Sequence, residues 1–162
     1  MSSTTTPSVD DRLTSRGITI PDPPSPVAIY VPAVQTGNYI YTSGQLPTVR
    51  GELVATGKVG AEVSPEQAAE AARQCTLNAL AAIRSLVGDL SRVIRVVKAV
   101  GYVASADGFT GQSAVMNGAS TLLGEVFGDH IGSHARSAVG VAALPLGAPV
   151  EVELVVEVAP PR

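Results

Sequence analysis

The stretch from Val150 to Val158 constrains the fold of this chain most, because its side chains alternate between two kinds. Every second residue, starting at Val150, is valine or leucine, and three of the four residues between them are glutamate. Successive side chains of a β-strand point to opposite faces of the sheet. The pattern therefore predicts a strand whose apolar face packs against helices. It also predicts that Glu151 and its neighbours lie on an uncovered face.

Two helices and two further strands are predicted between Ser64 and Ala142. Ser64 is a helix N-cap, Pro65 suits the first helical position, and Gln67 completes a capping box in a helix that Gly88 ends. Its predicted buried stripe is Ala68, Ala72, Cys75, Ala79, Ile83 and Leu86. A second helix is expected from Thr110 to Phe127, with Met116, Ala119, Leu123 and Val126 or Phe127 on its buried face. Val93 to Val103 and Arg136 to Ala142 are predicted strands.

The N-terminal part carries weaker signals. Residues 1–9 are predicted to be disordered, and Asp10 or Asp11 to cap a short helix that Gly17 ends. The proline-rich segment 21–26 is expected to be extended, and Tyr39–Ser43 and Gly51–Ala55 to be strands. The predicted order is β-β-β-α-β-α-β-β, an α+β fold with a single mixed sheet and two helices on one face. We expect an N-terminal extension over residues 1–20 and a single domain over residues 21–162.

The composition indicates that part of the surface is buried against other copies of the chain. Hydrophobic residues make up 45% of the sequence and charged residues 15%, with a mean hydropathy of +0.27. Basic residues are scattered, the net charge is −3 and there is no Trp, so we expect no nucleic-acid partner. No apolar run reaches the roughly 20 residues of a membrane span, and no signal peptide is recognisable. We therefore expect a soluble, cytoplasmic protein without membrane contact, in which the lone Cys75 is a buried apolar residue.

Arg136 and Glu151 are the candidate catalytic pair. They stand on the last two predicted strands, which are taken to be neighbours joined by the turn Leu144–Pro149. A guanidinium can bind a small carboxylate with two parallel hydrogen bonds, and a glutamate can move a proton on a nearby water or amine. A partly buried salt bridge between the two residues fits the same pattern. Both side chains are predicted to project from the uncovered face.

The chain resembles the YjgF/RidA family, which is also called endoribonuclease L-PSP, over roughly Tyr30 to Val158. The segments that carry the resemblance are Tyr41-Thr42-Ser43-Gly44-Gln45-Leu46-Pro47, Ala135-Arg136-Ser137, Leu144-Pro145 and Val150-Glu151-Val152-Glu153. The resemblance implies a chorismate-mutase-like fold and a homotrimer whose sheets form a barrel-like core. It also implies hydrolysis of reactive 2-imino or enamine acids to 2-keto acids and ammonia, at sites between subunits.

Family residues transfer to this sequence one by one. The resemblance implies that Arg136 holds the substrate carboxylate together with the backbone of Gly44, and that Glu151 positions or activates the attacking water. Ser43 and Tyr30 would line the pocket. Ala138 stands where the family often has cysteine, in a position that can act through its backbone. The implied ligand is a small carboxylate, and no cofactor or metal is expected.

The sequence departs from the family pattern in two further places. His134 replaces the proline that usually precedes the Ala-Arg pair, and it is interpreted either as a turn residue or as a group that tunes the pocket. The family asparagine that follows an Asp-Phe pair has no clean counterpart, since Asp107-Gly108-Phe109 is displaced and Asn117 lies further along. Two other functions stay open. One is a trimer that binds keto or amino acids without turnover, and the other is a ribonuclease, which the acidic balance disfavours.

Overall fold

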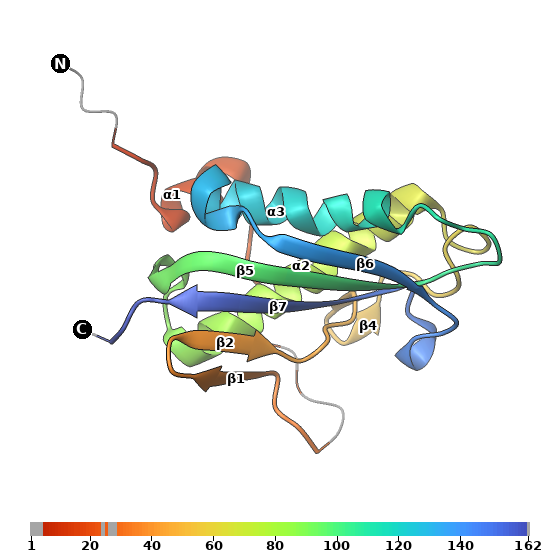
Figure 1. Cartoon of the computed structure of the whole chain (residues 1–162), viewed down its shortest axis with the longest axis horizontal. Helices are drawn as coiled ribbons and strands as arrows, with labels where there is room; N and C mark the ends of the chain where they lie inside the picture. The colour runs from red at the N-terminus through yellow and green to blue at the C-terminus, as the bar shows by residue number, and fades with distance from the viewer. Residues whose placement is uncertain (1–4, 24, 26–28, 162) are drawn as a thin grey trace.

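The computed structural model describes residues 5–23, 25 and 29–161. Its main sheet has five strands in the order β1-β2-β7-β5-β6 (Figure 1). The strands are β1 Ala33–Thr36, β2 Tyr39–Thr42, β5 Val93–Ala104, β6 Ala135–Val141 and β7 Val150–Val158. β5 and β6 run parallel and the other neighbours antiparallel, so the predicted mixed sheet is confirmed.

The prediction of a single sheet was wrong. β3 (Thr48–Val49) and β4 (Glu52–Leu53) form a separate two-stranded hairpin. The turn between them has Arg50 at φ 53° and Gly51 at φ 83°, and positive φ at both central residues is what a tight hairpin turn requires. The prediction from Gly51 to Ala55 thus located a strand but not the sheet to which it belongs.

The strand order also corrects the predicted neighbours of β6. The chain leaves β5, passes through α3 (Gln112–Gly132) and returns as β6, parallel to β5 and beside it, as a crossover connection requires. β7 then pairs antiparallel with the opposite side of β5 and with β2. β6 and β7 are therefore not adjacent, and β5 separates Arg136 from Glu151.

The main helix matches its prediction closely. α2 spans Pro65–Val87, with Ser64 and Gln67 forming the capping box and Gly88 at the C-cap. The predicted stripe is fully buried except for Leu86, which is 44% exposed. At this end of the helix, Val87 and Leu90 are buried in place of Leu86. Leu90 belongs to a 3-10 turn, Leu90–Arg92, which leads the chain from α2 into β5.

α3 is longer than predicted because it continues past a kink. Gly128 has φ 78° and ψ 168° inside the helix, which only glycine adopts at low cost. The predicted buried residues Met116, Ala119, Leu123, Val126 and Phe127 are confirmed. Two glycines allow α3 to pack closely against its neighbours. A Cβ on Gly118 of α3 would collide with the carbonyl of Ala69 in α2, and a Cβ on Gly101 of β5 would collide with Met116 of α3.

A third helix, α1 (Val9–Arg16), was only partly predicted. Its N-cap is Ser8, not Asp10 or Asp11, and Ser8 forms a capping box with Asp11. Gly17 ends the helix in the left-handed conformation, as predicted. The expected disorder is wrong for Val9, which is helical, while residues 1–4 lie outside the described part of the chain.

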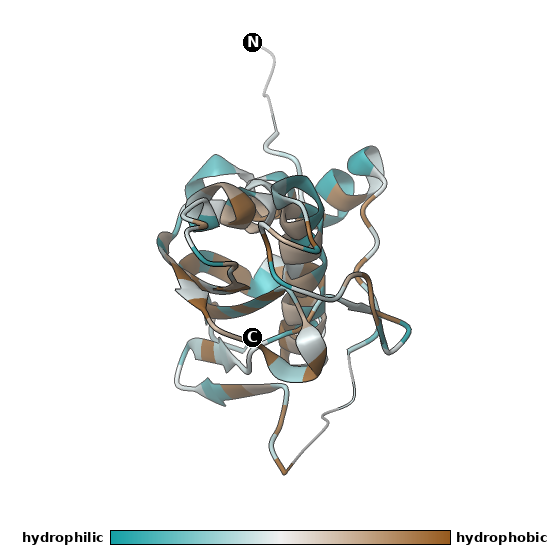
Figure 2. Cartoon of the chain, turned by 90° about the vertical axis from the view of Figure 1, so that its right-hand side faces the viewer, coloured by the Kyte–Doolittle hydropathy of each residue, from teal (hydrophilic) through white to brown (hydrophobic). Residues whose placement is uncertain are grey.

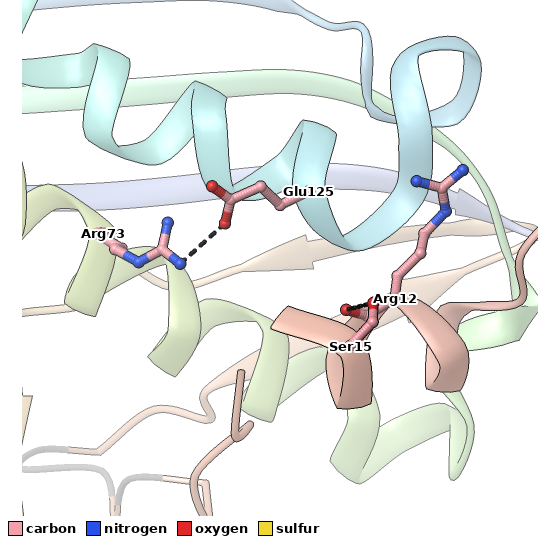
Figure 3. A network of polar contacts seen from close by, with 4 residues as sticks. All are labelled: Arg12, Ser15, Arg73 and Glu125. Carbon is pink, nitrogen blue, oxygen red and sulfur yellow. Dashed lines mark hydrogen bonds and ion pairs between the residues drawn. The ribbon is translucent and has the colours of Figure 1, made fainter. Parts of the chain in front are cut away.

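Figure 3 shows how these helices meet. Arg73 of α2 and Glu125 of α3 form an ion pair at 2.9 Å (Figure 3). The guanidinium of Arg12, from α1, lies against Gly128, where a Cβ would come within 2.8 Å of its Nη2 atom. The N-terminal helix thus packs on α3 at its kink.

The core fills the space between the sheet and helices α2 and α3. The alternation in β7 is confirmed, since Val150, Val152, Leu154, Val156 and Val158 are all buried. The residues between them are half-buried on the other face, which no described helix covers. Brown, apolar stretches in Figure 2 run along both the strands and the helices that face them.

Candidate functional site

Gly44 and Glu151 meet where β2 ends beside β7. The chain passes through Ser43 and Gly44 to Gln45, whose backbone pairs with Val152. Glu151 places its carboxylate against Gly44, so that any Cβ on residue 44 would collide with it. A carboxylate therefore lies directly beside a half-buried turn of backbone, at the position that the resemblance assigns to substrate.

Ser43 fixes this turn to the preceding segment. Its N–H donates to the carbonyl of Pro32 at 2.8 Å, and its hydroxyl donates to the carbonyl of Val31 at 2.6 Å. Ser43 thus holds the segment after Tyr30 against the end of β2. The Ser43 hydroxyl proton is donated to a backbone carbonyl and not to a general base, which a serine nucleophile needs to remove its proton.

Tyr30 and Gly44 line one cavity of about 560 Å³ together with Gln74, Asn78 and Arg50. Asn78 is one of the lining residues, and its Nδ2 donates to the carbonyls of Leu46 at 2.9 Å and Thr48 at 3.0 Å. Asn78 Oδ1 accepts from Gln74. These bonds tie the segment after Gly44 to α2.

Glu151 is half-buried and its pKa is raised, first by burial and second by the nearby charge of Glu153. The Glu153 carboxylate accepts a hydrogen bond from Tyr102 at 3.1 Å, and the pKa of Tyr102 is raised by its burial and by Glu153. A carboxyl group with a raised pKa can hold or release a proton closer to neutral pH, which suits general acid–base chemistry.

Cys75 lies beneath this site and is buried, as predicted. Its Sγ is 3.5 Å from the carbonyl of Val150. Burial raises the pKa of the thiol well above its usual value, and the charge of Glu151 raises it further. The thiolate needed for nucleophilic attack is therefore disfavoured, which supports a packing role.

Arg136 does not project from the uncovered face, contrary to the prediction. Its register partner is Ala99, which is buried beneath the helices, and its guanidinium reaches α3. Nη1 donates to Asn117 Oδ1 at 2.9 Å and to Ser120 Oγ at 3.1 Å, while Nη2 donates to the carbonyl of Ser113 at 3.2 Å. The three acceptors follow helical spacing on one side of α3.

Arg136 and Glu151 therefore lie apart within one chain. Arg136 stands opposite Ala99 of β5, and Glu151 stands opposite Tyr102. With strands about 4.8 Å apart and a rise of about 3.3 Å per residue, their Cα atoms are roughly 14 Å apart. The side chains also point to opposite faces, and they form no ion pair in the described part of the chain, so the salt-bridge interpretation is wrong for a single chain.

Ala138 follows Arg136 on β6, opposite Gly101 and on the helix side of the sheet. The predicted residues thus divide into two groups. One, the Gly44 group, contains Tyr30, Ser43, Gly44 and Glu151 near β2 and β7. The other, the Arg136 group, contains Arg136 and Ala138 on the edge strand β6.

Asn117 is a site residue that the sequence left unassigned. Its carboxamide contacts Arg136 directly, although it lies too far beyond Asp107-Gly108-Phe109 to match the family asparagine that follows an Asp-Phe pair. Helical spacing from Ser113 through Asn117 to Ser120 was the signal that could have found it.

His134 lies behind Arg136. Its Nε2 is 2.9 Å from Ser120 Oγ, and its Nδ1 is 2.6 Å from the carbonyl of Gly132. Ser120 therefore touches both Arg136 and His134. Of the two interpretations, a plain turn residue or a group beside the arginine, these contacts favour the second.

Across residues 5–23, 25 and 29–161, no three His, Cys, Asp or Glu side chains gather as metal ligands would. None of the helices in that part of the chain combines the length and apolar character needed to span a bilayer.

Comparison with known proteins identifies relatives along most of the chain. The family model described as endoribonuclease L-PSP matches residues 21–158. Protein TCP17 of Trypanosoma cruzi is 45% identical over 87% of this chain and 88% of its own length. A 2-iminobutanoate/2-iminopropanoate deaminase of Dermatophagoides farinae is 32% identical over 87% of this chain and 94% of its own.

A solved structure shows the same fold. It is the crystal structure of Atu1372 from Agrobacterium tumefaciens, a protein of unknown function. Its sequence is 43% identical, with a TM-score of 0.84 over 93% of this chain and 92% of the other.

Proposed function

Because the chain belongs to the endoribonuclease L-PSP family, also called YjgF/RidA, we propose that it hydrolyses reactive 2-imino and enamine acids to 2-keto acids and ammonia. The substrates would be small imino acids such as 2-iminopropanoate and 2-iminobutanoate. The observation that carries the proposal is the carboxylate of Glu151 beside the backbone of Gly44, with a raised pKa. The similarity to a relative named as a deaminase supports it.

The proposed reaction uses these residues without a cofactor. The guanidinium of Arg136 and the N–H of Gly44 bind the substrate carboxylate, which orients the adjacent C=N carbon. The imine enters protonated on its nitrogen, and Glu151 accepts a proton from water as the oxygen adds to that carbon, which gives a neutral amino alcohol. Glu151 then passes this proton to the nitrogen and takes the hydroxyl proton as the C–N bond breaks. Ammonia and a keto acid leave, and the last proton goes from Glu151 to ammonia or solvent. Tyr30, Ser43 and Ala138 would line the pocket that two subunits form together.

One chain cannot bring the Arg136 group and the Gly44 group to the same substrate, because Glu151 lies two strands away from Arg136 and projects from the other face of the sheet. A head-to-tail ring would join the β6 edge of one copy to the β1–β2 side of the next. We therefore propose that the protein is a homotrimer with a barrel-like core and three sites between subunits. The exposed apolar residues Val34, Tyr39, Tyr41 and Val139 support burial of the uncovered face.

The domain division at residue 21 and the cytoplasmic location stay predictions. A binding trimer without turnover and a ribonuclease are the competing functions. The deciding experiment generates 2-iminobutanoate from 2-aminobutanoate with an amino-acid oxidase and traps the surviving imine with semicarbazide. Added protein should lower the amount of trapped imine in proportion to its concentration.

Two parallel measurements make the assay decisive. Calorimetric titration with 2-oxobutanoate measures whether the protein binds the keto acid. Incubation with single-stranded RNA measures cleavage. Keto-acid binding without imine hydrolysis would assign the protein to the binding class, and RNA cleavage without either would overturn the proposal.

A further inference from the structure

The structure points to a polar relay behind Arg136, and we infer that Ser120 and His134 are positioning residues that fix how its guanidinium is presented to a carboxylate. The relay runs from the β6 arginine to the α3 serine and then to the histidine that precedes β6. This inference rests on the proposed function for the identity of the ligand, but the relay itself is defined by contacts within one chain.

The hydrogen-bond inventory of Arg136 shows what remains available for a ligand. A guanidinium has five N–H donors, two on each Nη atom and one on Nε. The contacts to Asn117 and Ser120 use both donors of Nη1, and the Ser113 carbonyl uses one of Nη2. No described residue accepts from the remaining Nη2 donor or from Nε. Those two N–H groups are the pair that a carboxylate can bind side by side.

The direction of the relay follows from the acceptor at its end. The carbonyl of Gly132 can only accept, so Nδ1 of His134 carries a proton at 2.6 Å from it. In the neutral ring, Nε2 is then an acceptor, and the single hydroxyl proton of Ser120 points to it. The lone pairs of Ser120 Oγ remain for Arg136. Each group thus has the donor or acceptor that its neighbour requires.

Ser120 needs this partner because it lies within a helix. A serine there can rotate its hydroxyl to donate to the carbonyl one turn earlier in its own helix. Ser85 of α2 shows the alternative in this protein, since its Oγ donates to the carbonyl of Ala82 at 2.6 Å. His134 selects the Ser120 rotamer that faces β6, and through it the position of Nη1.

The backbone reinforces this role. His134 stands two residues before Arg136, and its contact with Gly132 fixes the turn from α3 into β6. A proline, which the resemblance gives at this position, could hold the turn but could not accept from Ser120. His134 therefore combines a turn function with control of the arginine.

Four variants test the relay: Ser120→Ala, His134→Asn, His134→Gln and the double variant Ser120→Ala/His134→Asn. The amide of glutamine can place an acceptor near the position of Nε2, whereas that of asparagine reaches only the Nδ1 position. Ser120→Ala and His134→Asn should each raise KM for 2-iminobutanoate and Kd for 2-oxobutanoate by about 3- to 10-fold, with kcat less affected. His134→Gln should restore most of the affinity.

The double variant separates a relay from a mere turn. If His134 acts through Ser120, the double variant should bind 2-oxobutanoate as Ser120→Ala does, because the second change removes a contact already lost. Ser85→Ala is the matched control and should leave KM unchanged. Multiplicative losses in the double variant, or equal losses in the Gln and Asn variants, would overturn the inference.

One measurement stands apart from activity. The ¹⁵N relaxation of the Arg136 Nε–H group reports how firmly the side chain is held, and it should show greater motion in Ser120→Ala and His134→Asn than in the unaltered protein. Unchanged motion in both variants would overturn the relay. If the unaltered protein neither binds 2-oxobutanoate nor hydrolyses imines, the proposed function fails while this measurement still decides the relay.

Discussion

The carboxylate of Glu151 occupies the space that a Cβ on residue 44 would fill. Glu151 extends from β7 across the end of β2, and its Oε1 atom lies against the backbone of Gly44. Gly44 is not among the residues with positive φ, so the backbone conformation does not require glycine there. Glycine is needed because any side chain would collide with the Glu151 carboxylate. The finding links the turn that follows β2 to the acid that we propose to be catalytic.

Gly44→Ala should displace Glu151 and reduce imine hydrolysis by roughly 10²-fold or more, because a 1 Å shift of a catalytic group can cost that much. The rate is measured with the semicarbazide assay. Gly124→Ala is the control, since Gly124 lies in α3 with nothing within 4 Å of its Cβ position. The control should retain activity. Full activity of Gly44→Ala would show that the position of Glu151 does not matter.

Glu151→Gln should lower turnover by roughly 10²–10⁴, the range for loss of a general acid–base group, while keto-acid affinity persists through Arg136. Glu157→Gln, on the same face of β7 but at its far end, is the control and should keep its turnover. Since Arg136 and Glu151 form no ion pair within one chain, the variant should also keep its fold. Loss of stability and of ligand binding together would instead assign Glu151 to an intersubunit ion pair.

The same variant has a predicted pH dependence of stability. The folded-state pKa of Glu151 is raised by burial and by Glu153, so the folded chain binds its proton more tightly than the unfolded chain. Stability is therefore lost as the pH rises from the unfolded pKa of about 4.3 through the raised folded value. The melting temperature of Glu151→Gln relative to that of the unaltered protein should increase as the pH is raised from about 4 to about 7. A constant difference across this range would contradict the raised pKa.

Arg136→Lys should weaken keto-acid binding and imine hydrolysis by about 30- to 150-fold, on the order of 2–3 kcal/mol for a lost charged hydrogen-bond pair. Lysine keeps the charge but loses the planar donor pair of Nε and Nη2. Calorimetry with 2-oxobutanoate and steady-state kinetics measure the effect. Arg95→Lys, on β5, offers a control that should behave as the unaltered protein. Unchanged affinity in Arg136→Lys would make the arginine structural only.

Asn78→Asp should destabilise the fold by about 1–3 kcal/mol, because it replaces a donor to two carbonyls with an acceptor. The carbonyls are those of Leu46 and Thr48, both within 3.0 Å of Nδ2. Urea unfolding measures the loss, and Asn38→Asp at an exposed position is the control. Equal stability of the two variants would show that the segment after Gly44 needs no anchor on α2.

Tyr41→Glu should prevent trimer assembly, because it places a charge on the uncovered sheet face, where Tyr41 is 50% exposed. Light scattering of the unaltered protein should give the trimer mass, and the variant should give a smaller one with loss of activity. Leu86→Glu, on α2, is the control for an exposed apolar residue away from this face. A monomer mass for the unaltered protein at micromolar concentration would contradict the assembly and the shared site together.

The sequence alone determined the elements whose signals are local. The capping box of Ser64 and Gln67, the stop at Gly88 and the two-residue alternation of Val150–Val158 each depend on neighbouring residues, and all three are present in the structure. The position of Glu151 on the uncovered face followed from the same alternation. Periodicity and capping act within a few residues, so they can be read along the chain.

Only the tertiary structure decided which strands are neighbours and which way Arg136 faces. The turn before Val150 fits a hairpin between β6 and β7 equally well, but α3 returns the chain beside β5 and leaves β7 on the other side. That choice depends on which sheet edge is free when each strand docks, a property of the assembled layers. It also placed Asn117, Ser120 and His134 around Arg136, because packing of α3 on the sheet, and not spacing in the sequence, brings them together.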